Sequence, residues 1–212
     1  MKRIILFAII GGTALGAAYM VIFCRDWCKA VFYIHDMETE ERVARLQVKR
    51  VVDMLSLEKG DTVADIGAGT GLFSMAMAKR TGPEGKVYAV DINRSLLDHV
   101  EKKALQAGIG NIVPVEATED DPGIPAPVDL IFMCDTFHYV ALKSAYLTCL
   151  RKHLKPGGRL VIIDLKDKWP PFHDSYRFTV DELKKWAAAA GFRLVQEYDF
   201  LSEEFFVVFE LD

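Results

Sequence analysis

Short apolar runs alternate with longer amphipathic stretches through most of the chain. Runs of this kind, bounded by glycine or charged residues, predict buried strands, whereas apolar side chains three or four residues apart predict helices. The predicted strands are TVADIGA (62–68), KVYAVDI (86–92), IVPVEA (112–117), VDLIFMCD (128–135), RLVIIDL (159–165), FRLVQEYDF (192–200) and EFFVVFELD (204–212). The predicted helices cover residues 37–57, 71–81, 95–108, 142–154 and 179–191.

This alternation predicts an α/β fold. Strands that alternate with helices form right-handed βαβ units, which build a mainly parallel sheet with helices on both faces. Only Leu201–Glu203 separates the last two predicted strands. Because so short a connection excludes a helical crossover, we expect these two strands to form an antiparallel hairpin.

The N-terminal part of the chain has a different pattern. Residues 4–23, IILFAIIGGTALGAAYMVIF, contain no charged side chain, and twenty helical residues span ~30 Å, the thickness of a bilayer's hydrocarbon core. The stretch that follows mixes Trp27, Phe32 and Tyr33 with basic residues, as is typical of a membrane interface. We therefore expect a transmembrane anchor at 1–23, an interfacial linker at 24–37 and a folded domain at 38–212.

Two other interpretations of this segment are weaker. A cleaved signal peptide would use Lys2 and Arg3 as its basic end, but the apolar run continues through Met20–Phe23 instead of stopping. A buried core helix rarely runs so long without a charge. Gly12 and Gly16 form a GxxxG pattern that lets two membrane helices approach closely, which predicts a homodimer, although glycine is common in membrane spans.

Composition and charge narrow the class of protein. A hydrophobic content of 51% with 26% charged residues excludes a disordered or fibrous chain. Residues 24–212 carry 24 basic and 30 acidic side chains, so nothing in the charge favours a nucleic-acid partner. Because the four cysteines form no CxxC pair and no histidine spacing completes a zinc site, we predict no metal site and free thiols, with palmitoylation of Cys24 or Cys28 left open.

A glycine-rich loop follows the first predicted strand and opens a helix. It reads Asp65-Ile66-Gly67-Ala68-Gly69-Thr70-Gly71, and Asp91 ends the second strand about twenty residues later, where a carboxylate binds ribose hydroxyls. The dinucleotide fingerprint GxGxxG needs glycine where this chain has Leu72, and the Gly-Lys-Ser/Thr of a phosphate-binding P-loop is absent. The loop therefore favours an adenosyl ligand that carries an amino acid instead of phosphates.

DIGAGTG, VYAVDI and LKPGGRLVIID together resemble the class I S-adenosylmethionine-dependent methyltransferases. The resemblance covers about residues 38–212, and within the class the chain is similar to the small-molecule branch related to ubiquinone/menaquinone C-methyltransferases. It implies a Rossmann-like, seven-stranded, mostly parallel sheet of order 3-2-1-4-5-7-6 with one antiparallel strand, and S-adenosyl-L-methionine as the cofactor.

The same resemblance implies cofactor-binding roles for nine residues. Gly67, Ala68, Gly69, Gly71 and Asp65 would hold the methionine end, Asp91 the ribose, Ile92 the adenine ring and Asp120 the adenine amine, and Asp135 would face the sulfonium.

Methyl transfer from a sulfonium needs alignment of the acceptor, and a base only where the acceptor loses a proton. His138 follows the fourth strand and is the candidate base, the alternative being a histidine that only hydrogen-bonds its loop.

The loop 166–178 is rich in aromatic residues, which suits a hydrophobic acceptor unless the loop packs on its own domain. The candidate acceptor-binding residues in it are Trp169, Tyr176 and His173, and His173 is also a weaker second candidate base. The Asn/Asp-Pro-Pro-Tyr motif of adenine and glutamine methylation is absent.

We therefore expect a single-pass membrane protein whose methyltransferase domain lies on the cytoplasmic side, where the cofactor is found. The anchor and the aromatic loop favour a membrane-resident acceptor: a quinone precursor, a lipid, or a hydrophobic thiol or phenol. The alternatives are a methyltransferase that acts on a membrane protein and a non-catalytic cofactor-binding protein. A nicotinamide oxidoreductase is the weakest alternative, since the dinucleotide fingerprint is incomplete.

Overall fold

The computed structural model describes residues 37–166 and 177–212. The predicted anchor, nearly all of the predicted linker, and Trp169, His173 and Tyr176 lie outside the described residues. Residues 38–212 form one compact unit. Among the helices of the described part, none combines the length and the apolar character needed to cross a bilayer.

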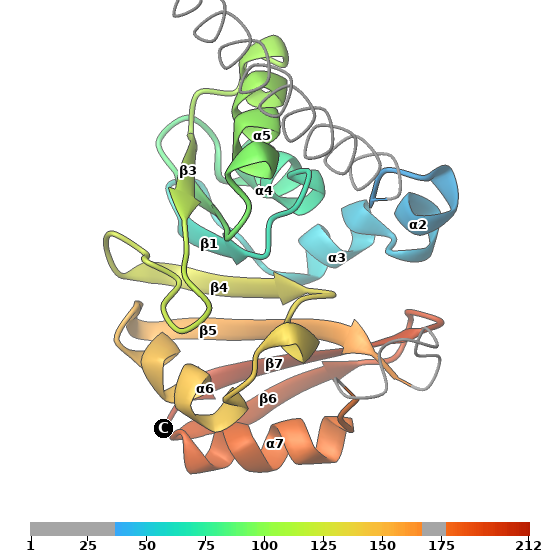
Figure 1. The fold of residues 1–212 in the computed structure, drawn as a ribbon, viewed down its shortest axis with the longest axis vertical. Helices are drawn as coiled ribbons and strands as arrows, with labels where there is room; N and C mark the ends of the chain where they lie inside the picture. Colours follow the sequence, from blue (N-terminus) through green and yellow to red (C-terminus); the bar gives the residue numbers. More distant parts are fainter. Residues whose placement is uncertain (1–36, 167–176) are drawn as a thin grey trace, which may run out of the picture. The chain divides into compact units, whose positions relative to one another are not determined.

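The unit is built on one seven-stranded sheet (Figure 1). Its order is β3-β2-β1-β4-β5-β7-β6, and β7 runs antiparallel to both of its neighbours, β5 and β6. Order and hairpin are as the sequence predicts. The strands are β1 (Thr62–Ile66), β2 (Lys86–Asp91), β3 (Ile112–Glu116), β4 (Val128–Cys134), β5 (Leu154–Leu165), β6 (Phe192–Tyr198) and β7 (Glu204–Leu211).

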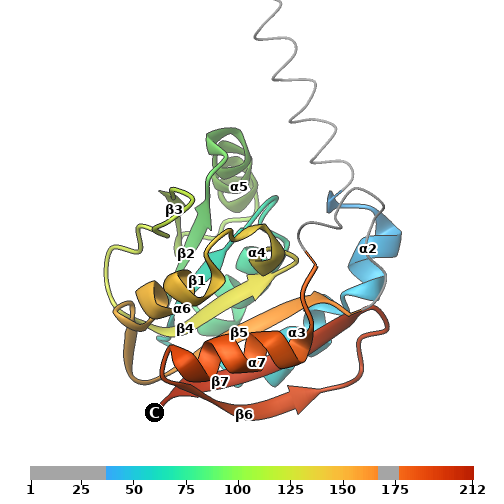
Figure 2. The same ribbon diagram turned by 60° about the horizontal axis from the view of Figure 1, so that its bottom comes forward.

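Helices cover both faces of the sheet (Figures 1 and 2). Alternate side chains of a strand enter opposite cores, so Ile131 and Met133 pack with α6 and α7, whereas Leu130 and Phe132 pack with α3 and α4. A further helix, α5, packs against β2 and β3. The helices are α2 (Glu40–Arg45), α3 (Val48–Met54), α4 (Leu72–Thr81), α5 (Arg94–Gln106), α6 (Lys143–Arg151) and α7 (Val180–Ala189), with a 3-10 turn η1 (Phe137–Tyr139).

The single helix predicted over 37–57 is wrong, because the chain forms two helices with a break at Gln47. The backbone of Gln47 is left-handed, with φ 43°, and its side-chain amide donates a hydrogen bond to the Phe200 carbonyl at 3.1 Å. Leu46, just before the break, is fully buried. Periodicity alone does not detect such a break, because Leu46 at the end of α2 and the apolar side chains of α3 enter the same core.

The start of the fifth strand also differs from the prediction. The sequence predicts a helix to Leu154 and a strand from Arg159, but α6 ends at Arg151 and β5 begins at Leu154. Pairing with β4 starts at Val128–Leu154 and resumes at Leu130–Arg159. The intervening Lys-Pro-Gly-Gly residues therefore form an irregularity inside the strand, not a turn before it.

Candidate active site

The glycine loop lies at the carboxyl end of β1, beside the carboxyl ends of β2 and β4. Gly67 and Ala68 both donate backbone hydrogen bonds to the Val90 carbonyl, at 2.8 and 3.0 Å, which ties the loop to β2. Gly71 has φ 76° and is the N-cap of α4. The loop thus turns directly into a helix N-terminus, whose free N–H groups face the edge where ligands of open α/β sheets bind.

Gly67 brings this loop against the segment that follows β4. Its φ is 73°, and a Cβ placed there would overlap Oγ1 and Cγ2 of Thr136 and come within 2.8 Å of the Thr136 Cβ. The Thr136 hydroxyl is itself fixed by a 2.9 Å hydrogen bond to the Cys134 carbonyl. Because only glycine fits at this position, the backbone after β1 packs directly against the Thr136 side chain after β4.

The carboxylate of Asp91, which is predicted to bind the ribose of the cofactor, is hydrogen-bonded to the glycine loop. One carboxylate oxygen accepts the Gly69 N–H at 2.9 Å, and the other accepts the Asn93 N–H at 2.9 Å. Burial raises the pKa of Asp91, and these backbone hydrogen bonds oppose the rise. Ile92, next in the chain, is 61% exposed. A carboxylate fixed beside an exposed apolar side chain suits a ribose with its attached base.

Asp65 lies beneath the loop and is 3% exposed. Its carboxylate accepts a short hydrogen bond from the Ser74 hydroxyl of α4. Burial raises the pKa of Asp65 to about 7, the Ser74 bond lowers it, and the neighbouring Asp91 charge raises it further. Asp65 therefore joins β1 to α4 and titrates near neutral pH.

Because of Asp65, we expect the free energy of unfolding to fall as the pH rises. The folded state keeps a proton that the unfolded state releases near pH 3.8, so this contribution is complete below that pH and is lost as the pH rises through about 7. At most ~4 kcal/mol is involved, at 1.36 kcal/mol per pKa unit. Asp65→Asn should flatten the dependence of the urea midpoint on pH between 5 and 8. Asp53→Asn, at a half-exposed carboxylate of α3, is the control; parallel curves for wild type and Asp65→Asn would contradict the assignment.

Asp135 immediately follows β4 and is paired with arginines of α2. Its backbone is left-handed, with φ 50°, and its carboxylate lies 2.9 Å from Arg42 Nη2 and 3.8 Å from Arg45 Nη2. Arg45 also forms ion pairs with Glu204, which is fully buried, and with Glu203. Because these pairs join α2 to the ends of β4 and β7, α2 is fastened across the same edge as the glycine loop. The sequence did not single out Arg42 or Arg45.

Asp120 lies in the connection between β3 and β4 and is exposed. Just before it, the Ala117 N–H donates to the Asp91 carbonyl at 3.0 Å. The segment that carries Asp120 therefore begins beside the predicted ribose-binding residue. Its proposed contact with the adenine amine stays a prediction.

His138 lies in the turn η1 and forms a buried pair with Asp164 near the end of β5. The ring Nδ1 lies 2.7 Å from Asp164 Oδ1, and the His138 backbone N–H donates to Asp164 Oδ2 at 3.0 Å. His138 is 3% exposed and Asp164 is fully buried. Since an ionised carboxylate only accepts hydrogen bonds, Nδ1 carries the proton and Nε2 is the basic nitrogen.

Asp164 is a further candidate site residue that the sequence reasoning missed. The available signal is an acid inside the apolar run VIIDL, where an unpaired carboxylate would be costly to bury. Its partner is visible only through the register of the sheet, in which Cys134 of β4 lies opposite Ile163 of β5. That register places the residues after Cys134 beside Asp164.

Three comparisons with known proteins agree with this geometry. Residues 64–160 match the family model described as a methyltransferase domain. The ubiquinone/menaquinone biosynthesis C-methyltransferase of Cupriavidus metallidurans is 34% identical over 131 residues, 59% of this chain and 53% of that protein. Its counterpart in Neisseria meningitidis serogroup B is 30% identical over 155 residues, 72% of this chain and 62% of that protein. The chain thus spans between about half and two thirds of these relatives.

Solved structures show the same fold. A SAM-dependent methyltransferase of Aquifex aeolicus is 28% identical with a TM-score of 0.76, over 84% of this chain and 97% of that one. A TehB-like SAM-dependent methyltransferase of Corynebacterium glutamicum shares the fold at 16% identity, with a TM-score of 0.63 over 92% of this chain and 100% of that one.

The fold is therefore that of the class I S-adenosylmethionine-dependent methyltransferases, and residues 64–160 are similar to a methyltransferase domain. Within that class, the chain is related in sequence to the ubiquinone/menaquinone C-methyltransferases. S-adenosyl-L-methionine is the cofactor that this domain implies, and the residues present fit it: Gly67 leaves no side chain between the loops, and Asp91 offers a fixed carboxylate.

Proposed function

We propose that the protein transfers a methyl group from S-adenosylmethionine to a small hydrophobic acceptor. A membrane-resident quinone precursor is the first candidate, with a lipid or a hydrophobic thiol or phenol as further ones. The observation that carries this proposal is the convergence of the glycine loop, Asp91 and the His138–Asp164 pair on one edge of the sheet. The C-methylation named for the quinone-biosynthesis relatives supports an aromatic acceptor.

The glycine loop and Asp91 would hold S-adenosylmethionine, which when bound would supply the methyl group on an activated sulfonium. The chain's own residues position the reactants and move a proton. The glycine loop and Asp91 orient the cofactor, and alignment of this kind supplies ~7–11 kcal/mol. A phenol or an activated ring carbon loses one proton when it is methylated, and His138 Nε2 takes that proton while Asp164 keeps the ring oriented.

Labelled methyl transfer tests the proposal. The full-length protein is incubated with methyl-labelled cofactor and fractionated membranes, and the labelled product is identified by mass spectrometry. Label in an extractable quinol, lipid or phenol supports the proposal. Label in a protein band would instead support a protein methyltransferase, and cofactor binding without any transfer would support a non-catalytic binding protein.

We further propose that residues 4–23 anchor the protein in a membrane, with the methyltransferase domain on the cytoplasmic side. The support is the length and uncharged composition of this segment. The full-length protein should stay in membranes washed at alkaline pH, whereas Ile9→Lys/Leu15→Lys should move it to the soluble fraction, since each central lysine costs ~2.5–3.5 kcal/mol. Release of the unaltered protein, or a mature chain that lacks the segment, would overturn the anchor.

We also propose that two anchors pair through Gly12 and Gly16. The GxxxG spacing supports this, because it lets two membrane helices approach closely. Cross-linking of the full-length protein in membranes should then give a dimer that Gly12→Leu removes and Thr13→Leu leaves in place. A cross-linked dimer that persists in Gly12→Leu would contradict pairing through this face.

A further inference from the structure

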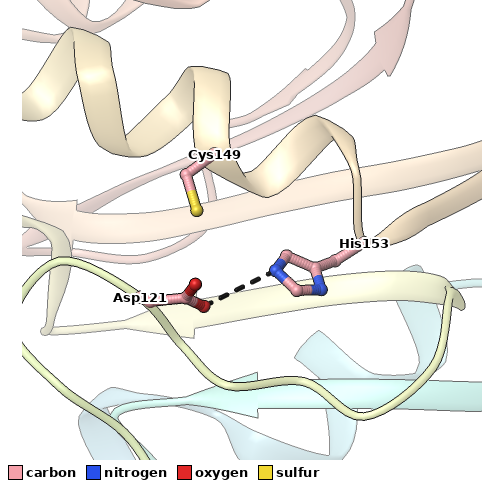
Figure 3. A group of neighbouring side chains, drawn as sticks. All are labelled: Asp121, Cys149 and His153. Atoms are coloured by element: carbon pink, nitrogen blue, oxygen red, sulfur yellow. Dashed lines mark ion pairs between the residues drawn. The ribbon is translucent and has the colours of Figure 1, made fainter.

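Asp121, Cys149 and His153 come together near the start of β4 (Figure 3). A carboxylate oxygen, the thiol sulfur and an imidazole nitrogen lie within 4.8 Å of one another, and all three residues are half-buried. The His153 carbonyl accepts the N–H of Val128, the first residue of β4, at 2.8 Å, whereas Asp135 follows the last residue of that strand. The seven residues of β4, ~20 Å, therefore separate His153 from Asp135 at the other end of the strand.

The imidazole of His153 is oriented toward the other two side chains. Its Nε2 is buried and has no hydrogen-bond partner among the described residues. In the tautomer that carries its proton on Nδ1, Nε2 presents a lone pair. The lone pair faces Asp121 Oδ1 at 3.7 Å, too far for a hydrogen bond. Two acceptors that face each other in this way are stabilised by a cation between them.

The third donor identifies the kind of cation. A proton would join His153 to Asp121 but would leave the sulfur of Cys149 without a role, whereas a divalent metal binds all three. Sulfur, nitrogen and oxygen together suit Zn²⁺, and Mg²⁺ and Ca²⁺ avoid sulfur. Donors ~2.0–2.3 Å from a tetrahedral zinc lie ~3.3–3.8 Å from one another, so the histidine and the aspartate already have the required spacing.

We propose that Asp121, Cys149 and His153 bind Zn²⁺ or a similar borderline divalent cation, with water in the fourth position. The ion joins the β3–β4 connection to the end of α6. The signal in the sequence is Cys149-x-x-x-His153, two ligands one helical turn apart, which a search for CxxC pairs does not find. Asp121 is added only by the fold.

Lys152 competes for the same carboxylate. Its Nζ lies 3.2 Å from Asp121 Oδ2, and its side chain is 58% exposed. Bound metal displaces this ammonium to solvent. Removing the lysine charge should therefore strengthen metal binding at this cluster.

Cobalt and zinc titrations of the full-length protein test the site. Co²⁺ should give a thiolate-to-metal charge-transfer band with one equivalent bound, and Cys149→Ser should abolish the band. In competition with a chromophoric chelator, His153→Gln and Asp121→Asn should each weaken Zn²⁺ binding by about tenfold or more, and Lys152→Gln should strengthen it several-fold. His99→Gln, which removes another partly buried histidine, is the matched control and should change nothing.

Circular dichroism shows whether each variant is folded, so that a loss of metal binding is not confused with unfolding. If Cys149→Ser does not fold, the His153 and Asp121 variants decide the outcome. Absence of a thiolate band in the unaltered protein overturns the proposal. So does a band that persists in Cys149→Ser, since the metal would then use other cysteines, or Zn²⁺ binding that His153→Gln and Asp121→Asn leave unchanged.

Discussion

Replacing His138 with glutamine should lower kcat for methyl transfer by about 10²–10⁴, the usual contribution of a general base. The affinity for S-adenosylmethionine should stay within a few-fold, because the side chain takes a proton from the acceptor and does not hold the cofactor. A rate that depends on an unprotonated imidazole rises with pH. The variant should therefore lose the acid limb of its kcat–pH profile as well as its rate, and stopped-time assays with labelled cofactor measure both.

Asp164→Asn should reproduce most of this loss without touching the reacting atoms. The carboxylate accepts both the Nδ1–H and the backbone N–H of His138, together with the N–H of Leu165. An amide in its place favours the wrong tautomer, in which Nε2 carries the proton and is no longer a base. Asp164 is therefore a positioning residue, and its replacement should lower kcat much more than it raises KM for the acceptor.

A purely structural role for the pair predicts a different result. Leaving a buried donor without its acceptor costs ~1–3 kcal/mol, so both variants would lower the melting temperature and lose activity only through unfolding. His99→Gln is again the matched control for loss of a histidine. If kcat per folded molecule and the pH profile of His138→Gln equal those of the wild type, the histidine only holds its loop.

The sequence predicts the sheet well because alternation is a local property. The run VDLIFMCD predicts a buried strand, and in the structure Ile131 and Met133 enter one core whereas Leu130 and Phe132 enter the other. The order of the strands follows from the resemblance, and the closing hairpin from the short connection before β7. None of these predictions requires the register in which neighbouring strands pair.

The site residues that the sequence did not predict depend on strand register and on the break between two helices. Asp164 meets His138 only because β4 and β5 pair in the register that sets Cys134 opposite Ile163. Arg42 meets Asp135 only because the chain turns at Gln47 and directs a short helix across the edge of the sheet. A left-handed glutamine has no sequence signature, since glutamine is an ordinary helix former. Register and helix breaks, not composition, therefore limit the prediction.

Gly67→Ala should abolish detectable binding of S-adenosylmethionine, a loss of at least about 100-fold or ~2.7 kcal/mol. Two costs act together. The added Cβ overlaps the Thr136 side chain, which its hydrogen bond to the Cys134 carbonyl holds in place, and alanine at φ 73° is strained by ~1–2 kcal/mol. The loop must therefore shift at the end of β1, which disturbs the hydrogen bond from the Gly69 N–H to Asp91 and the placement of the glycine N–H groups.

Gly108→Ala separates these two costs. Gly108 has nearly the same φ, 67°, but a Cβ there meets nothing within 4 Å. We expect this variant to lose ~1–2 kcal/mol of stability from strain alone and to bind the cofactor normally, as calorimetry on both proteins would show. The double variant Gly67→Ala/Thr136→Gly removes the three Thr136 atoms that lie nearest to the new Cβ, so it should recover part of the affinity. If Gly67→Ala binds the cofactor normally, the contact between the β1 and β4 loops is not needed to form the cofactor site. Gly108→Ala introduces similar backbone strain without such a contact and therefore shows the effect of strain alone.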